Sequence, residues 1–326
     1  MFEVVIVGGG PAGLNAALLL GRARRRVLLC DAGAPRNAPV AHLHGFLSRD
    51  GLPPAELGRI GRDQLAAYPS VALRQLEVAA VSPTAGGDGL VVTLADGTRE
   101  RARRLLLATG VVDQLPAIDG LAGLWGRSVF NCPYCHGWEV RDQPLAVLGT
   151  DQRALQLAVH LTRWSDDVVW CSNGPLPAPL AEAARAPLAA RGVRLHQAPI
   201  VRLEGDDGQL ARIVLATGAP LERRAAFLHP PTRQRSALPG QLGCVLLEDG
   251  SVSVGDFGQA SVAGVFAAGD MARRPTMPHP GAQVVIAAAE GAIAAIAIDQ
   301  DLVRNDLASS PLAPPRLVAP RIGTAP

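Results

Sequence analysis

The chain has 326 residues, and its 31 basic and 29 acidic side chains leave a formal net charge of only +2. It contains no lysine, so every basic side chain is an arginine. Enzymes that use a lysine Schiff base are therefore excluded, as is the GxxxxGK[ST] phosphate loop, because each needs a lysine amine. The near-neutral charge also argues against nucleic acid as a partner.

Length and cysteine content favour a cytoplasmic protein of two domains. The five cysteines are Cys30, Cys132, Cys135, Cys171 and Cys244. An odd count with a single close pair does not suit the disulfide framework of a secreted protein. The nearest approach to a membrane span, 284–298, is interrupted by Glu290 and falls short of the roughly 20 residues required, so we expect no membrane partner.

The chain begins with the pattern of a strand, a glycine turn, a helix and a second strand. Residues 2–7 are an apolar β-branched run, the sequence GGGPAG occupies 8–13, and 14–20 continues as an apolar helix. Residues 27–30 predict a second buried strand, which ends at Asp31. Together these segments predict a βαβ unit at the start of the chain.

Between a strand and a helix, the spacing Gly8-x-Gly10-x-x-Gly13 predicts a dinucleotide site. Gly8 permits the tight turn, Gly10 lets a diphosphate approach the backbone, and Gly13 lets helix and strand pack closely. The helix N-terminus offers N–H groups to phosphates, and Asp31 would accept a hydrogen bond from a ribose hydroxyl. The alternative is a plain glycine-rich turn with a surface aspartate.

The segment after the first predicted helix carries a run of arginines at 22–26. They form either a patch for a partner or solvated charges at a helix C-terminus, and the helix dipole favours the second interpretation. Further along, 90–94 and 105–107 predict strands, and the stretch 115–126, rich in Pro and Gly, predicts a linker.

After this linker the pattern restarts as a second βαβ unit. Residues 145–148 predict a strand, 154–161 a helix and 168–170 another strand. An Ala-rich helix is predicted at about 283–298. The Pro-rich tail from about 309 has no periodicity and is predicted to be loose.

The sequence NCPYCHGW at 131–138 holds the close cysteine pair. A C-x-x-C spacing lowers the pKa of one thiol and allows a small disulfide ring that exchanges readily, which predicts redox chemistry at Cys132 and Cys135. Zinc binding, a structural disulfide and two unrelated buried thiols remain as alternatives, although zinc needs two further ligands and so short a loop gains little stability. We expect no bound metal ion.

The side chains around the pair suggest further roles. A neutral His136 can take a proton from an incoming thiol and return it later, or it can be a histidine held by packing and hydrogen bonds. Trp125 and Trp138 flank the pair, and together with Tyr134 they can wall a pocket for a small molecule. Packing in the core is the alternative for the tryptophans.

Four motifs together resemble the low-molecular-weight thioredoxin reductase family. They are GGGPAG at 8–13, ATG at 108–110, the C-x-x-C pair, and GVFAAGD at 264–270. Their order and spacing match the family across nearly the whole chain. The resemblance implies an α/β fold of two Rossmann-like, three-layer dinucleotide-binding domains, a bound FAD and a homodimer.

In this family the second domain is inserted into the first. The resemblance therefore implies an FAD-binding domain at 1–119 and 245–326 and an NAD(P)-like domain at 120–244. It implies that Cys135 faces the flavin and that Cys132 exchanges with substrate. It assigns FAD contacts to Gly8, Gly10, Pro11, Ala12, Gly13, Asp31, Arg36, Asn37, His44, Val78, Ala108, Thr109, Gly110, Gly269, Asp270, Gln283 and Val284.

Two departures from the family concern the nicotinamide nucleotide. The inserted domain of the family carries GxGxxA after its first strand, whereas residues 149–154 read GTDQRA, so Asp151 puts bulk and negative charge where a diphosphate would lie. The arginine cluster that holds the extra phosphate of NADPH is replaced by CSNG at 171–174. We therefore expect NADP(H) to bind weakly or not at all.

A third departure is His136 in CPYCHG, where the reductases have an aspartate. This motif resembles the branch of FAD-dependent dithiol oxidases that close the disulfides of natural products such as gliotoxin, holomycin and romidepsin, as do 31–37 and 44–47. The resemblance implies oxidation of a small-molecule dithiol, with oxygen as electron acceptor and hydrogen peroxide as product. His279, just before the last predicted helix, would be a second base or a surface loop histidine.

Three other functions stay open from the sequence. They are an NADPH-dependent thioredoxin or disulfide reductase, an NADP-linked dithiol dehydrogenase, and a flavoprotein that senses redox state without turnover. For a dithiol oxidase, a biosynthetic role and a self-resistance role would use the same chemistry.

Overall fold

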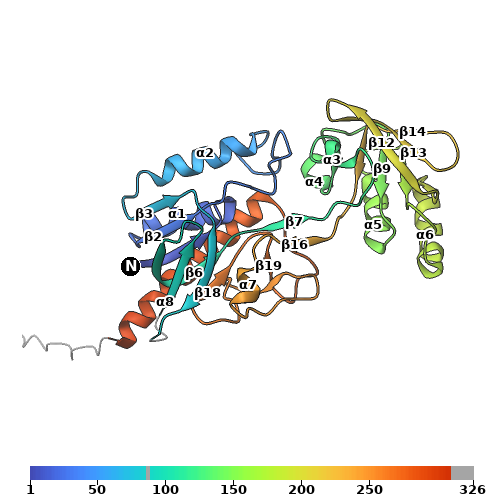
Figure 1. Cartoon of the computed structure of the whole chain (residues 1–326). Coiled ribbons are helices and arrows are strands. Elements are labelled where there is room, and N and C mark those ends of the chain that lie inside the picture. The colour runs from blue at the N-terminus through green and yellow to red at the C-terminus, as the bar shows by residue number, and fades with distance from the viewer. Residues whose placement is uncertain (86–88, 310–326) are drawn as a thin grey trace, which may run out of the picture.

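The computed structural model describes residues 1–85 and 89–309, which form two α/β units joined by two extended segments of chain (Figure 1). The predicted loose tail lies outside the described residues from 310 onward. Within the described ranges, no helix combines the length and apolar character needed to cross a membrane.

The first unit is built on a sheet whose parallel strands include β1 (Phe2–Val7), β2 (Val27–Cys30) and β6 (Arg99–Leu107). The predicted strands 2–7 and 27–30 coincide with β1 and β2, because residues 4–7 and 27–30 are apolar runs buried on both faces. β18 (Val265–Ala267) also pairs with β6 in parallel, so a segment near the end of the chain completes this sheet.

Three further strands extend this sheet at its edges. β3 (Val71–Arg74) lies beside β2, and β4 (Val78–Pro83) pairs with β5 (Leu90–Leu94) in an antiparallel arm that continues onto β6. The sequence predicted only 105–107 within β6. Its first half reads RERARR and pairs with the arm, where one face of the antiparallel sheet tolerates charge.

Two helices, α1 (Pro11–Arg22) and α8 (Val284–Ser309), pack against each other and against one face of this sheet. Their alanines allow a close approach, and Gly291 of α8 allows the closest, because a Cβ atom there would lie 2.1 Å from the carbonyl oxygen of Ala12. The sequence predicted the apolar centre of α1 but neither of its ends, and it predicted the start of α8 to within one residue but not its end. α2 (Pro54–Leu65), which has few buried residues, was not predicted.

Gly291→Ala is expected to destabilise the protein by about 1–3 kcal/mol, because the added methyl group forces α1 and α8 apart. The matched control is Gly123→Ala, where a Cβ atom would meet nothing within 4 Å. There the change is expected to be neutral or slightly stabilising. Thermal unfolding of the two variants checks this, and equal midpoints would contradict the tight helix contact.

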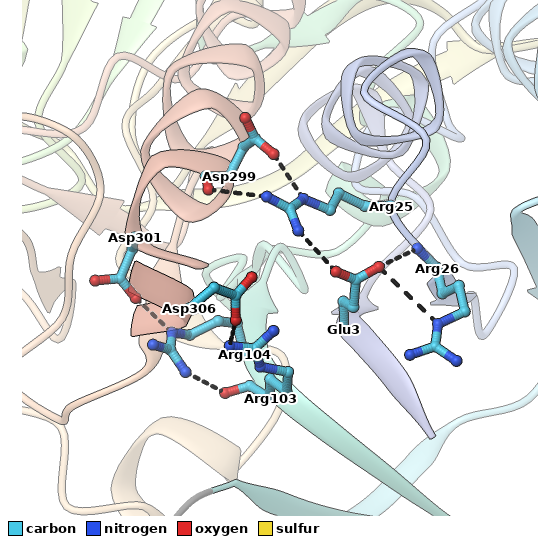
Figure 2. A network of polar contacts seen from close by, with 8 residues as sticks. All are labelled: Glu3, Arg25, Arg26, Arg103, Arg104, Asp299, Asp301 and Asp306. Atoms are coloured by element: carbon cyan, nitrogen blue, oxygen red, sulfur yellow. Dashed lines mark hydrogen bonds and ion pairs between the residues drawn. The ribbon is translucent and has the colours of Figure 1, made fainter. Parts of the chain in front are cut away.

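The far end of α8 is fastened to the sheet by arginine–carboxylate contacts (Figure 2). Arg25 bridges Glu3 at 2.8 Å and Asp299 at 2.6 Å, and Arg104 pairs with Asp301. The side chain of Arg25 is only 15% exposed. The interpretation of the 22–26 arginines as solvated charges is therefore wrong for Arg25, which joins β1, α1 and α8.

The second unit contains a five-stranded parallel sheet in the order β11-β10-β9-β15-β8. Its strands are β8 (Val129–Phe130), β9 (Leu145–Leu148), β10 (Val168–Cys171), β11 (Arg194–His196) and β15 (Ala225–Phe227). Its helices are α5 (Gln152–Leu161) and α6 (Ala178–Arg191), and β12 (Ile200–Asp206), β13 (Gln209–Leu215) and β14 (Leu221–Glu222) form a small antiparallel sheet. The predicted βαβ unit is β9–α5–β10.

The chain passes between the units along β7 (Val111–Asp113) and returns along β16 (Thr232–Gln234), and these strands pair antiparallel. The predicted linker at 115–126 begins just past β7, but it contains the short helix α3 (Leu121–Leu124), whose buried leucines pack in the second unit. The remaining short elements are α4 (Pro133–His136), α7 (Leu238–Gln241), β17 (Val252–Ser253) and β19 (Ala272–Arg273).

Candidate active site

A cavity of about 1070 Å³ is lined by residues of both units. This is at the upper end of the size of small-molecule sites and suits a ligand as large as a dinucleotide. The predicted residues that line it are Gly8, Gly10, Pro11, Ala12, Asp31, Arg36, Asn37, His44, Val78, Ala108, Thr109, Gly110, Trp125, Cys135, His136, Gly269, Asp270, Gln283 and Val284. Gly13, Cys132, Tyr134, Trp138 and His279 are not among the described lining residues.

The glycine turn between β1 and α1 has the geometry of a phosphate cradle. Gly8 has a φ of +111°, and a Cβ atom on it would lie 2.2 Å from the carbonyl oxygen of Ala108. A Cβ atom on Gly13 would lie 1.8 Å from the carbonyl oxygen of Gly8, whereas Gly10 has nothing within 4 Å and leaves open space. These are the three roles that the motif predicts, and they place free backbone N–H groups at the start of α1.

One glycine of this turn was missed by the sequence reasoning. A Cβ atom on Gly9 would lie 2.3 Å from a carboxylate oxygen of Asp31, so only glycine lets this acidic side chain sit beside the turn. The other carboxylate oxygen of Asp31 accepts a hydrogen bond from the Gly33 N–H at 3.0 Å. The triple glycine in the sequence was the available signal.

Arg36 joins carboxylates from two distant parts of the chain. Its guanidinium donates to Asp113 at 2.9 and 2.6 Å and to Asp270 at 2.7 Å. Burial alone would lower the pKa of Arg36, but hydrogen bonds and charges from both aspartates raise it above its usual value. The resemblance supplied Arg36 and Asp270, while Asp113 was missed because nothing in its neighbourhood marks it as a partner.

Glu290 on α8 is a third missed residue. Its carboxylate accepts a hydrogen bond from the backbone N–H of Gly269 at 2.8 Å, which fixes the turn before Asp270. Burial raises the pKa of Glu290. In the sequence, Glu290 is a single charge within an apolar helix. Because a buried charge needs a partner, this pattern is the signal that could have identified it.

These features fit FAD. The open space at Gly10, the N–H groups at the start of α1 and the carboxylate of Asp31 suit a diphosphate and an adjoining ribose. The cavity continues from there past Asp270 to Gln283 and Val284, and reaches Cys135 on the second unit. A single elongated ligand can therefore contact the nucleotide-binding turn and the redox pair together.

The close cysteine pair is joined as a disulfide between Cys132 and Cys135, and their Cα atoms are 5.2 Å apart. Zinc binding is therefore not the state of this pair. The Sγ atom of Cys132 caps α4 by accepting from the Cys135 N–H at 3.1 Å, and of the two paired cysteines Cys135 is the one among the described lining residues of the cavity. Cys30, Cys171 and Cys244 are free and buried.

His136 lies in the cavity wall directly after the pair. Its ring stacks on Phe130, with centroids 4.3 Å apart and an interplanar angle of 5°. Neither ring nitrogen has a hydrogen-bond partner among the described residues, although both are buried. Burial, and next the charge of His44, lower the pKa of His136 to about 4, so the ring is neutral at physiological pH.

Three aromatic side chains near the pair separate into two groups. Trp125 lines the cavity and also packs against the core of the second unit, so it fits both of its alternatives. Tyr134 and Trp138 do not line it; they are 69% and 66% exposed, and Arg141 lies 4.0 Å over the Trp138 ring. Core packing is thus wrong for Trp138, and its predicted place in the cavity wall is wrong as well. The short helix α4 turns both rings outward.

His279 is the other correction. Its exposed ring lies on a loop, with Nδ1 3.1 Å from the carbonyl oxygen of Pro280, and it is outside the described cavity lining. It corresponds to the surface loop histidine of the two alternatives.

In the second unit, the turn that would bind a nucleotide diphosphate is blocked by one of its own residues, Asp151. Gly149 has a φ of +146°, as such a turn needs, but the Asp151 carboxylate caps α5 by accepting from the Ala154 N–H at 2.9 Å. A negative charge therefore occupies the helix N-terminus that would bind a diphosphate. At the end of β10, Asn173 accepts from the Ile200 N–H and offers no cation to a phosphate.

Comparison with known proteins assigns the chain to a family. Residues 2–293 match the family model described as pyridine nucleotide-disulphide oxidoreductase. The chain belongs to this family. Thioredoxin reductase sirT of Leptosphaeria maculans is 31% identical over 325 residues, which cover 95% of this chain and 97% of the relative. Thioredoxin reductase tcpT of Claviceps purpurea is 33% identical over 277 residues, 82% of this chain and 86% of the relative.

A solved structure agrees with these relatives. The crystal structure of HlmI is 40% identical, has a TM-score of 0.86 and is matched over 94% of each chain. The protein is therefore a disulfide oxidoreductase of the thioredoxin reductase type, with the α/β fold of that family, and the family implies bound FAD.

Proposed function

We propose that this disulfide oxidoreductase oxidises a small-molecule dithiol to an intramolecular disulfide, with oxygen as the electron acceptor. The observation that carries the proposal is the Asp151 carboxylate at the N-terminus of α5, where the electron donor NADPH would place its diphosphate. Because the Asp151 carboxylate and the NADPH diphosphate are both negative, we infer that a thiol, and not NADPH, supplies the electrons that reduce the cysteine pair. The resemblance of CPYCHG to the dithiol oxidases supports the same direction of reaction.

The chain's own residues provide the exchange chemistry. A substrate thiol gives its proton to neutral His136, and its sulfur attacks Cys132, which forms a mixed disulfide and releases the Cys135 thiolate. The second substrate thiol loses its proton and attacks the substrate sulfur of the mixed disulfide. A ring disulfide leaves, and both cysteines are now reduced.

The glycine turn and Asp31 would hold FAD, and the bound flavin would supply the two-electron chemistry that links the reduced pair to oxygen. The balance is one dithiol and one oxygen molecule giving one cyclic disulfide and one hydrogen peroxide. Cys135 belongs to this exchange because it lines the cavity, and the neutral ring of His136 beside it can accept a proton.

An NADPH-dependent disulfide reductase is the second candidate, since the relatives sirT and tcpT are named thioredoxin reductases. Addition of each reductant to the FAD-loaded protein without oxygen separates the two. We expect dithiothreitol to bleach the flavin absorbance within seconds and equimolar NADPH to leave it unchanged. On admission of air, dithiothreitol should drive oxygen uptake with one peroxide formed per dithiol. Rapid bleaching by NADPH would overturn the proposal.

A further inference from the structure

His44 lies between His136 and two carboxylates. It follows β2 on a loop of the first unit, and its side chain is 18% exposed. Its ring meets the His136 ring edge-on, with centroids 6.2 Å apart and an interplanar angle of 86°. Its Nδ1 is 3.6 Å from Asp50 Oδ1, and its Nε2 is 3.6 Å from Glu139 Oε1.

These groups form a path from the cysteine pair to solvent. Both ring nitrogens of His136 are buried and have no hydrogen-bond partner among the described residues, and His44 is mostly buried. Beyond His44 lie the exposed Asp50 and Glu139, together with the exposed ring of His42, whose centroid is 6.5 Å from that of His44. No other titratable contact to the His44 ring is seen in the described part of the chain.

The proposed reaction needs such a path. Each dithiol releases two protons in succession, one for each attack on a disulfide, while His136 holds only one at a time. Burial keeps the pKa of His136 at about 4, so the protonated ring persists only while the Cys135 thiolate stands beside it. His136 must therefore be deprotonated again before the second thiol can react.

We propose that His44 is the positioning residue that resets His136, by taking its proton through one bridging water and passing it on to solvent. Neither ring nitrogen of His136 makes a direct hydrogen bond to a described residue, and the ring centroids are 6.2 Å apart, so the transfer that we propose needs a bridging water. In the step, the thiol proton goes from substrate sulfur to His136 and then to one nitrogen of His44. The other nitrogen of His44 releases a proton towards Asp50 or Glu139, and the net products are the mixed disulfide, the Cys135 thiolate and one solvent proton.

The path is assembled from both units. His44 and Asp50 belong to the first unit, whereas His136 and Glu139 belong to the second. The inference rests on the proposed function, because it concerns protons released at the same cysteine pair.

The test measures reduction of the pair itself, so it requires neither oxygen nor flavin turnover. Wild-type protein, His44→Gln and the control His196→Gln are mixed with dithiothreitol without oxygen, and free thiols are trapped by alkylation and counted by mass. His196 lies on β11, outside the cavity lining. We expect His44→Gln to slow the pair's reduction about tenfold or more, flatten its pH profile and regain rate with added imidazole. Because His44 lines the FAD cavity, the rates are compared among molecules that carry FAD.

Three results overturn the relay: a wild-type rate and pH profile in His44→Gln, a loss that imidazole does not restore, or an equal loss in His196→Gln. The proposed function fails separately. If the wild type never consumes oxygen with a dithiol, the oxidase proposal is wrong, yet an imidazole-rescued defect in pair reduction would still establish His44 as the residue that resets His136.

Discussion

Under the proposed function, Cys132→Ser is expected to lower dithiol-driven oxygen uptake by about a thousandfold or more, because it removes the sulfur that the substrate would attack. Cys135→Ser should cost as much, since the pair can no longer store two electrons as a disulfide. Oxygen consumption at saturating dithiol measures both. Cys244→Ala is the matched control, a buried free cysteine outside the cavity lining, and should retain wild-type turnover.

The two serine variants are expected to differ in their spectra. In Cys132→Ser, the remaining Cys135 lines the FAD cavity, and its thiolate should add a long-wavelength charge-transfer absorbance to the flavin spectrum that disappears on acidification. In Cys135→Ser, the remaining Cys132 is outside that lining and should add none. The reverse pattern would exchange the roles that we assign to the two sulfurs.

Arg36→Met is expected to destabilise the protein by about 3–5 kcal/mol and to release FAD, because the change leaves two largely buried carboxylates without their cation. The side chains of Asp113 and Asp270 are only 9% and 20% exposed, so water cannot replace the guanidinium fully. Chemical denaturation and the ratio of flavin to protein absorbance measure the two effects. Arg36→Lys should restore only part of both, because an ammonium cannot match the two-pronged contact with Asp113.

The control for Arg36 is Arg59→Met. Arg59 also joins two carboxylates, Glu56 at 2.6 Å and Asp63 at 2.5 Å, but on the exposed surface of α2. Exposed ion pairs of this kind contribute little, so its unfolding midpoint should stay close to that of the wild type. If both variants lost the same stability, burial would not be the reason that Arg36 matters.

The parts of the fold that the sequence predicted are those where the signal is local. β1, β2, β5 and β9 lie at the predicted positions because each is a short apolar run between turn residues. α2 and α6 were missed because the first buries few residues and the second contains Pro187, so neither shows a continuous apolar face. The polar half of β6 was missed for a similar reason, since its partner strand and not its own composition makes it extended.

The difference between local and distant signals also explains which residues of the candidate site could be predicted. A six-residue motif predicts the roles of Gly8, Gly10 and Gly13, and the geometry of the glycine turn agrees with them. Asp113 meets Arg36 from 77 residues away, and no spacing rule relates the two. Tyr134 and Trp138 show the opposite error, because nearness in sequence to a reactive cysteine does not decide on which side of a one-turn helix a ring emerges.

The pairing of β18 with β6 has a consequence for synthesis on the ribosome. Val265–Ala267 joins a strand that ends at Leu107, and between them lies the whole second unit. The second unit contains all strands of its own sheet within 129–227 and has the contacts to fold as soon as it emerges. The first sheet must wait with an open edge on β6 until residue 267 is free, and α8 can close over α1 only later still. The FAD cavity is thus the last part of the molecule to form, although its glycine turn is among the first residues made.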